Sequence, residues 1–189
     1  MTPIRDSDVP ASLDEVAARV RHSSNFRFTW QWFDLGVATS ALPADAERVM
    51  STLITTPACH AFLGDSFNPM YEPTFTIEPV HEHSQFREAT LEFERTLARA
   101  AADRLGAYSR HLTDAEPADV EMVRRSFGTA APYTVFVLEP GRATGCTVCE
   151  IHNGYLFTNW FYGVAWDWCF CLLSSARPLA WVGVLTDTD

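Results

Sequence analysis

The chain has 189 residues, of which 47% are hydrophobic and 13% aromatic, and its 14 basic residues are all arginine, set against 24 carboxylates for a net charge of −10. This composition argues against a disordered chain and predicts one folded domain over residues 1–189. The absence of lysine excludes Schiff-base chemistry, pyridoxal-phosphate anchoring and the phosphate-binding lysine of a P-loop. The acidic balance argues against a nucleic-acid partner, since phosphate binding needs a basic surface.

Several features predict a cytoplasmic protein. Residues 1–30 contain no charged segment followed by an apolar one, as a secretory signal would. The odd cysteine count argues against a disulfide framework. The apolar run 155–173 contains Asn159, Gly163 and Asp167 and is rich in aromatic residues, so strands explain it better than a membrane span. The lysine-free, alanine- and arginine-rich composition suggests a GC-rich bacterial genome.

The N-terminal part predicts a helix, a strand and a second helix. Ser12 and Glu15 form a capping-box pattern, and apolar residues at helical spacing follow as far as Val20. Residues 26–32 alternate between aromatic and polar side chains, which is typical of a strand with one buried and one solvent-exposed face. A second helix is expected from Pro43 to the residues before Pro57, followed by one short turn that stops at Gly64.

The middle of the chain predicts an ordered loop and two further helices. Prolines interrupt residues 65–80, although 75–80 fit a short edge strand. The longest helix is expected from Ser84 to about Leu105, with Phe86 and Phe93 on its buried face and Gly106 at its end. Another helix is expected after Pro117.

The last third predicts an antiparallel meander. Its strand-like runs are 133–138, 146–152, 155–162, 166–173 and 179–186. Asn153 and Gly154 suit a two-residue type I′ turn between the second and third runs. The expected fold is therefore α+β: an antiparallel sheet of five to six strands, formed by this meander and one N-terminal strand, with about four helices covering one face.

The run 166–173 is apolar on both faces, which predicts a central strand. Cys169 and Cys171 share one face and are expected to pack in the core, because neighbours two apart in a strand are too distant for an easy disulfide. The second face of this strand needs a cover. Helices of the same chain, a second copy in a homodimer or a target protein would each supply it.

Acidic and aromatic residues define the predicted surface for a partner. Four carboxylates cluster around the start of the helix after Pro117, where they also suit the helix dipole: Asp114, Glu116, Asp119 and Glu121. We expect three tryptophans of the C-terminal sheet to belong to the same partner-binding surface: Trp166, Trp168 and Trp181. With Trp160 and Tyr162, the same tryptophans form an alternative, an aromatic pocket for a flat small molecule.

A different candidate is a metal site. His81, His83 and Glu88 form a His-x-His motif followed by glutamate, which resembles the first metal motif of cupin barrels, and the resemblance implies a divalent transition metal. The second cupin motif has no counterpart around His152, which is a separate candidate for a fourth ligand. The resemblance covers eight residues only. The glycine expected after the glutamate is absent, and Glu88 falls inside the predicted long helix.

Two cysteine motifs are weaker candidates, one for a zinc site and one for a catalytic nucleophile. Cys146, Cys149 and His152 have zinc-knuckle spacing, but in a strand the two cysteines would point to opposite faces, and no second such pair follows. Cys59 stands beside His60, where adjacent side chains rarely aim at each other and no third orienting group can be assigned.

These features favour a non-catalytic, protein-binding module that engages a basic partner. In outline such a chain is similar to the small acidic immunity proteins that neutralise bacterial toxins, although no particular residue carries this likeness. The alternatives are the metal-dependent enzyme with the His-x-His/Glu site and the small-molecule binder with the aromatic pocket.

Overall fold

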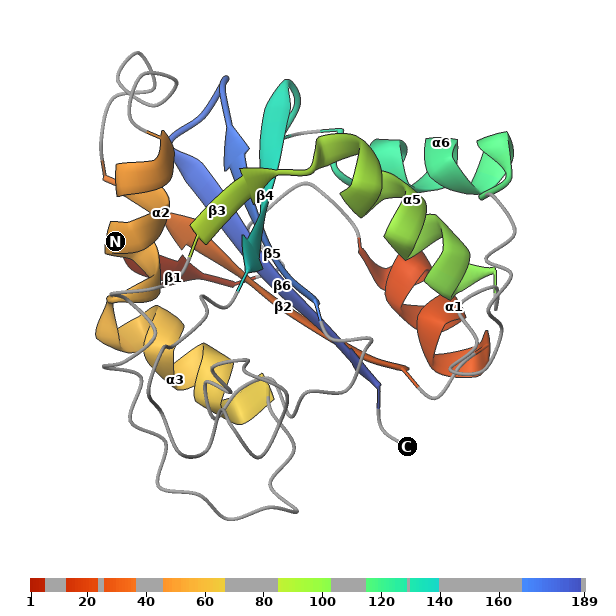
Figure 1. The fold of residues 1–189 in the computed structure, drawn as a ribbon, viewed down its shortest axis with the longest axis horizontal. Coiled ribbons are helices and arrows are strands. Elements are labelled where there is room, and N and C mark those ends of the chain that lie inside the picture. The colour runs from red at the N-terminus through yellow and green to blue at the C-terminus, as the bar shows by residue number, and fades with distance from the viewer. Residues whose placement is uncertain are drawn as a thin grey trace, which may run out of the picture.

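The computed structural model describes residues 1–5, 13–23, 26–36, 46–66, 85–102, 115–128, 130–139 and 168–187. These form one six-stranded antiparallel sheet and five helices, and the expected α+β class is confirmed (Figure 1). The strand order is β1-β2-β6-β5-β4-β3. The strands are β1 (Thr2–Ile4), β2 (Phe26–Asp34), β3 (Gln85–Glu88), β4 (Tyr133–Glu139), β5 (Trp168–Ser174) and β6 (Leu179–Asp187).

Helices cover both faces of the sheet, so the expectation of one covered face is wrong. The helices α1 (Asp14–Ser23), α5 (Thr90–Ala101) and α6 (Pro117–Ser126) lie on one side, and α2 (Ala46–Ile54) and α3 (Pro57–Ser66) lie on the other (Figure 1). Each side encloses its own apolar cluster. None of the helices in these ranges is long and apolar enough to cross a membrane.

The strand β5 shows why two helical layers are needed. Phe170 and Leu172 pack toward α1, α5 and α6, whereas Cys169, Cys171 and Leu173 belong to the opposite cluster. All five side chains are almost fully buried, as alternation along a strand with two covered faces requires. The cover over the second face thus comes from helices of the same chain.

The strand β2 follows its predicted alternation on one face only. Phe28 and Trp32 are buried against the three-helix layer, with Trp30 partly buried beside them. The opposite face is not fully exposed to solvent, because Phe33 is completely buried under the other layer. Gln31 on this face donates its side-chain amide to the carbonyl of Ile4 in β1 at 2.7 Å.

The predicted helix over 84–105 is wrong in its first turn. Residues 85–88 form β3, which pairs with β4 at the end of the sheet, and α5 begins only at Thr90. Phe86 and Phe93 are seven residues apart and therefore fit one helical face, but Phe86 packs in the α2/α3 cluster and Phe93 in the opposite one. Pairing with a strand distant in sequence overrode the local pattern.

Other boundaries also differ from expectation. The helix α3 extends through Gly64 to Ser66, so the expected short turn is a full helix, and β1 was not predicted. β4 pairs directly with β5, so successive strand-like runs are not simply neighbours in the sheet. The two runs between them, 146–152 and 155–162, lie outside the described residues, as does the proposed edge strand 75–80.

Candidate functional site

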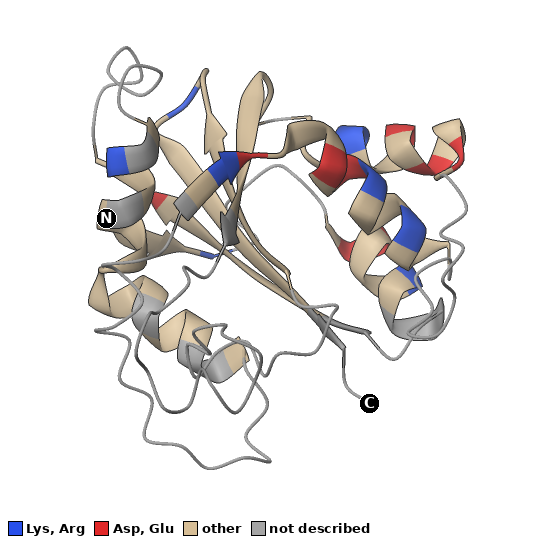
Figure 2. Ribbon diagram, viewed as in Figure 1, with Lys and Arg blue, Asp and Glu red and all other residues tan. Residues whose placement is uncertain are grey.

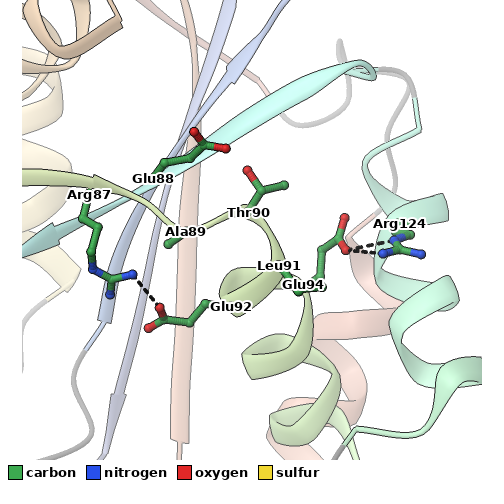
Figure 3. A pocket seen from close by; sticks show the side chains of 8 residues that line it. All are labelled: Arg87, Glu88, Ala89, Thr90, Leu91, Glu92, Glu94 and Arg124. Carbon is green, nitrogen blue, oxygen red and sulfur yellow. Dashed lines mark hydrogen bonds and ion pairs between the residues drawn. The ribbon is translucent and has the colours of Figure 1, made fainter.

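A shallow, open depression of about 600 Å³ lies where β3 passes into α5, with α6 on its far side (Figure 3). We call it the β3–α5 depression. Its lining combines three carboxylates and two guanidinium groups with small or apolar side chains: Arg87, Glu88, Ala89, Thr90, Leu91, Glu92, Glu94 and Arg124.

The change from strand to helix fixes the floor of this depression. Ala89 is buried, and its N–H donates to the carbonyl of Val135 in β4 at 2.8 Å. The N–H of Val135 in turn donates to the hydroxyl of Thr90 at 3.0 Å, where the ladder would otherwise end. The first residue of α5 therefore continues the pairing of β3 with β4, and the start of the helix is held against the sheet.

A buried carboxylate joins three elements beside the depression. Glu94 in α5 is only 6% exposed. Its Oε2 accepts hydrogen bonds from Nε and Nη2 of Arg124 in α6 at 2.9 and 2.8 Å, and its Oε1 accepts one from the hydroxyl of Tyr133 in β4 at 3.0 Å. Charge-assisted hydrogen bonds of this kind satisfy a carboxylate that burial would otherwise destabilise.

The same network changes two proton affinities. Hydrogen bonding to Glu94, and then its negative charge, raise the pKa of Arg124, which therefore stays charged. Burial, followed by the nearby carboxylate of Glu94, raises the pKa of Tyr133. Glu94, Arg124 and Tyr133 thus form a structural brace that joins α5, α6 and β4. At neutral pH, Arg124 in this brace is charged and Tyr133 is protonated.

The outer part of the depression is more accessible. Arg87 and Glu92 form an ion pair at 2.8 Å, with 47% and 40% of their side chains exposed. Glu88 is exposed, and no hydrogen bond or ion pair of this carboxylate is found in the described part of the chain. Leu91 is 51% exposed, a high value for a large apolar side chain. An exposed carboxylate and an exposed leucine that line one depression suit a partner side chain with an apolar stem and a cationic end.

Two of the four carboxylates of the predicted acidic cluster are exposed on α6. Glu116 is the exposed N-cap residue of α6, and Glu121 is exposed on the same helix. Asp119 has an 18% exposed side chain and lies 3.6 Å from Arg19 of α1, so it links two helices. Asp114 lies outside the described residues.

The predicted aromatic surface is not formed by Trp181. This side chain is fully buried, and its ring centroid lies 5.1 Å from that of Phe127 and 5.5 Å from that of Phe93, both edge-to-face. Trp181 therefore cannot line a surface or pocket. Trp168 is partly buried against the same core, and Trp160, Tyr162 and Trp166 lie outside the described residues.

The metal hypothesis finds no assembled ligand set in the ranges that the structure describes, where no three ligand-type side chains converge. Glu88 is on a strand rather than in the predicted helix. His81, His83 and His152 lie outside those ranges, as do Cys146 and Cys149.

Three cysteines are buried structural thiols. Cys59, Cys169 and Cys171 are fully buried in the α2/α3 cluster, as predicted for the last two. Burial raises the pKa of Cys59, and a hydrogen bond with Cys169 together with burial raises that of Cys171. A protonated thiol is a poor nucleophile, so Cys59 is not activated.

The net charge is distributed unevenly along the chain. The described ranges contain 13 of the 24 carboxylate residues and 11 of the 14 arginines, a net of −2, so −8 of the total of −10 belongs to the other residues. Figure 2 shows arginines and carboxylates interspersed on α1, α5 and α6. The helical layers are therefore nearly balanced, and a local carboxylate such as Glu88 matters more there than the total.

Comparison with known proteins gives no assignment: no family model, curated protein or solved structure matches this chain. Sequence reasoning did not identify Glu94, Arg124, Tyr133 or Leu91. Leu91 carried a detectable signal, because it lies two positions before the buried Phe93 and thus about 200° away around the helix. An apolar residue there faces solvent.

Proposed function

We propose that this chain is a non-catalytic module that binds a basic partner protein, with the β3–α5 depression as the contact. The observation that supports the proposal is that the exposed Glu88 carboxylate and the 51% exposed Leu91 both line this depression. An arginine or lysine of a partner would lay its methylenes on Leu91 and its charge on Glu88.

The surroundings of Glu88 support a binding role. Glu94 is bound by Arg124 and Tyr133, and Glu92 is paired with Arg87. Glu88 is the lining carboxylate for which no partner is found among the described residues. The net charge of −10 would accelerate encounter with a basic protein over longer distances. An inhibitor or immunity-type protein in the cytoplasm of a bacterium fits this behaviour, and the free, buried thiols suit a reducing compartment.

The test compares two carboxylates on the same protein. Binding to a panel of basic proteins, including those encoded beside its gene, is measured by calorimetry for the wild type, Glu88→Gln, Glu116→Gln and Leu91→Ala. Both glutamates are exposed, and each substitution removes one negative charge. Glu88→Gln and Leu91→Ala should weaken binding by about tenfold, as expected for losing one favourable contact, whereas Glu116→Gln should have little effect.

Salt provides the second readout. Raising NaCl from about 50 mM to about 500 mM should weaken wild-type binding, and the Glu88→Gln variant should be less sensitive. Equal weakening by Glu88→Gln and Glu116→Gln would mean diffuse charge attraction without a site. Absence of binding to every basic protein at low salt would refute the proposal.

A further inference from the structure

We infer that the partner binds as an extended basic segment that adds a strand to the outer edge of β3. This inference rests on the proposed function and specifies how the partner is held. β3 is the last strand of the sheet order in the described residues, pairing with β4 on one side. An edge strand presents main-chain donors and acceptors that another extended chain can use.

The hydrogen-bond pattern identifies which groups face outward. The N–H of Ala89 donates to Val135 in β4, and Arg87 stands opposite Val137. Main-chain groups alternate in direction along an antiparallel strand, so Arg87 and Ala89 direct theirs at β4 whereas Phe86 and Glu88 direct theirs away from it. Within the described part of the chain, Phe86 and Glu88 therefore offer the N–H and C=O groups that a new strand would pair with.

The chemistry of the edge selects the occupant. Glu88 is exposed at the end of β3, and a cationic side chain on the added strand would form an opposite-charge pair with it. The adjoining depression, with Leu91 exposed, accommodates the side chains that such a strand directs toward α5. A second copy of this chain is a poor occupant, because each copy carries −10 and the charges repel.

The probe is a short peptide of alternating arginine and valine, with blocked termini, and the control is the same peptide with alternate backbone nitrogens methylated. The methylated peptide keeps the charge and side chains but cannot complete a strand ladder. The unmethylated peptide should bind wild-type protein at least about tenfold more tightly than the methylated one, because methylation removes several main-chain hydrogen bonds.

Amide hydrogen exchange locates the contact. On binding, the amides of Phe86 and Glu88 should become protected, whereas the Arg87 amide, which already points at β4, should change little and serves as the internal control. Glu88→Gln removes the charge alone, and Glu88→Pro removes in addition an N–H that points away from the sheet, a position where proline is tolerated in an edge strand. Glu88→Pro should therefore bind the peptide more weakly than Glu88→Gln.

The outcomes separate this inference from the proposed function. Equal binding of both peptides without protection of Phe86 and Glu88 would overturn strand addition while leaving a basic contact at Glu88. A basic protein whose binding depends on Glu88 but does not protect these two amides would also overturn strand addition and leave the contact at Glu88. A dimer of the protein whose formation protects the β3 amides would also overturn the inference, since the edge would then belong to a second copy.

Discussion

Gly183 in β6 is expected to be one of the least replaceable residues of the described core. Trp181 and Gly183 are two apart in the strand and share the face beneath α5 and α6. A Cβ atom at Gly183 would overlap three atoms of the six-membered ring of Trp181. The indole therefore lies directly over the glycine, and no side chain fits between them.

The surrounding packing leaves Trp181 little room to move. Its ring contacts Phe93, Phe127 and Phe28, at centroid distances of 5.5, 5.1 and 6.1 Å. On the flanking strands, Gly183 stands opposite Trp30 and Phe170. Overpacking costs about 1–3 kcal/mol and occasionally more, and a rigid indole places Gly183→Ala near the upper end, at about 3 kcal/mol.

Urea unfolding followed by far-UV circular dichroism measures this loss. A cost of about 3 kcal/mol should lower the melting temperature by about 6 to 12 °C for a chain of this size. Gly128→Ala is the control, because among the described residues its Cβ would meet only the carbonyl group of Arg125, with the oxygen at 3.1 Å. This substitution should cost at most about 1 kcal/mol.

A double-mutant cycle tests the cause. In a Trp181→Leu background the ring is gone, so Gly183→Ala should cost at least about 1 kcal/mol less than in the wild type. A Gly183→Ala protein within about 0.5 kcal/mol of the wild type, or a cycle in which the two costs simply add, would refute the reasoning.

Three further outcomes are expected. Phe93→Ala should lower the free energy of unfolding in urea by about 3–5 kcal/mol, because it removes a fully buried ring that contacts Phe127, Phe170 and Trp181. Leu91→Ala should change it by no more than about 0.5 kcal/mol. Similar costs for both substitutions would contradict the difference in burial. The pKa of Tyr133 is raised on folding, so its contribution to stability is complete below pH 10 and is lost as pH rises above that value; the free energy of unfolding should fall more steeply there for wild type than for Tyr133→Phe, and parallel curves would contradict this. Iodoacetamide at mildly alkaline pH should leave Cys59, Cys169 and Cys171 unmodified in the folded protein and modify them in urea, as peptide mass spectrometry would show; rapid labelling of the folded protein would show that these thiols are accessible.

The features that the sequence predicted correctly depend on local periodicity. Leu13, Val16 and Val20 recur at helical spacing and are all completely buried in or beside α1. The two apolar faces of the run 166–173 predicted a central strand, and β5 lies between β6 and β4. These patterns need only the neighbours in the chain.

The features that the sequence missed depend on distant contacts. Glu94 is buried because Arg124 and Tyr133, 30 and 39 residues away, supply its hydrogen bonds. Residues 85–88 form a strand because β4 pairs with them. Trp181 is predicted from the sequence to lie on a surface, but its face of β6 is covered by a helical layer, and so the side chain is buried. None of these partners can be read from spacing along the chain.

The position of β6 has a consequence for how this protein is made. β6 follows every other described element in the chain, yet in the sheet it lies between β2 and β5. During synthesis, β2 cannot pair with β6 until residues 179–187 leave the ribosome, more than 140 residues after β2 itself. Such long-range closure is slow and leaves apolar edges open to aggregation. A nascent chain stalled before Leu179 should therefore depend on chaperones in a way that the completed chain does not.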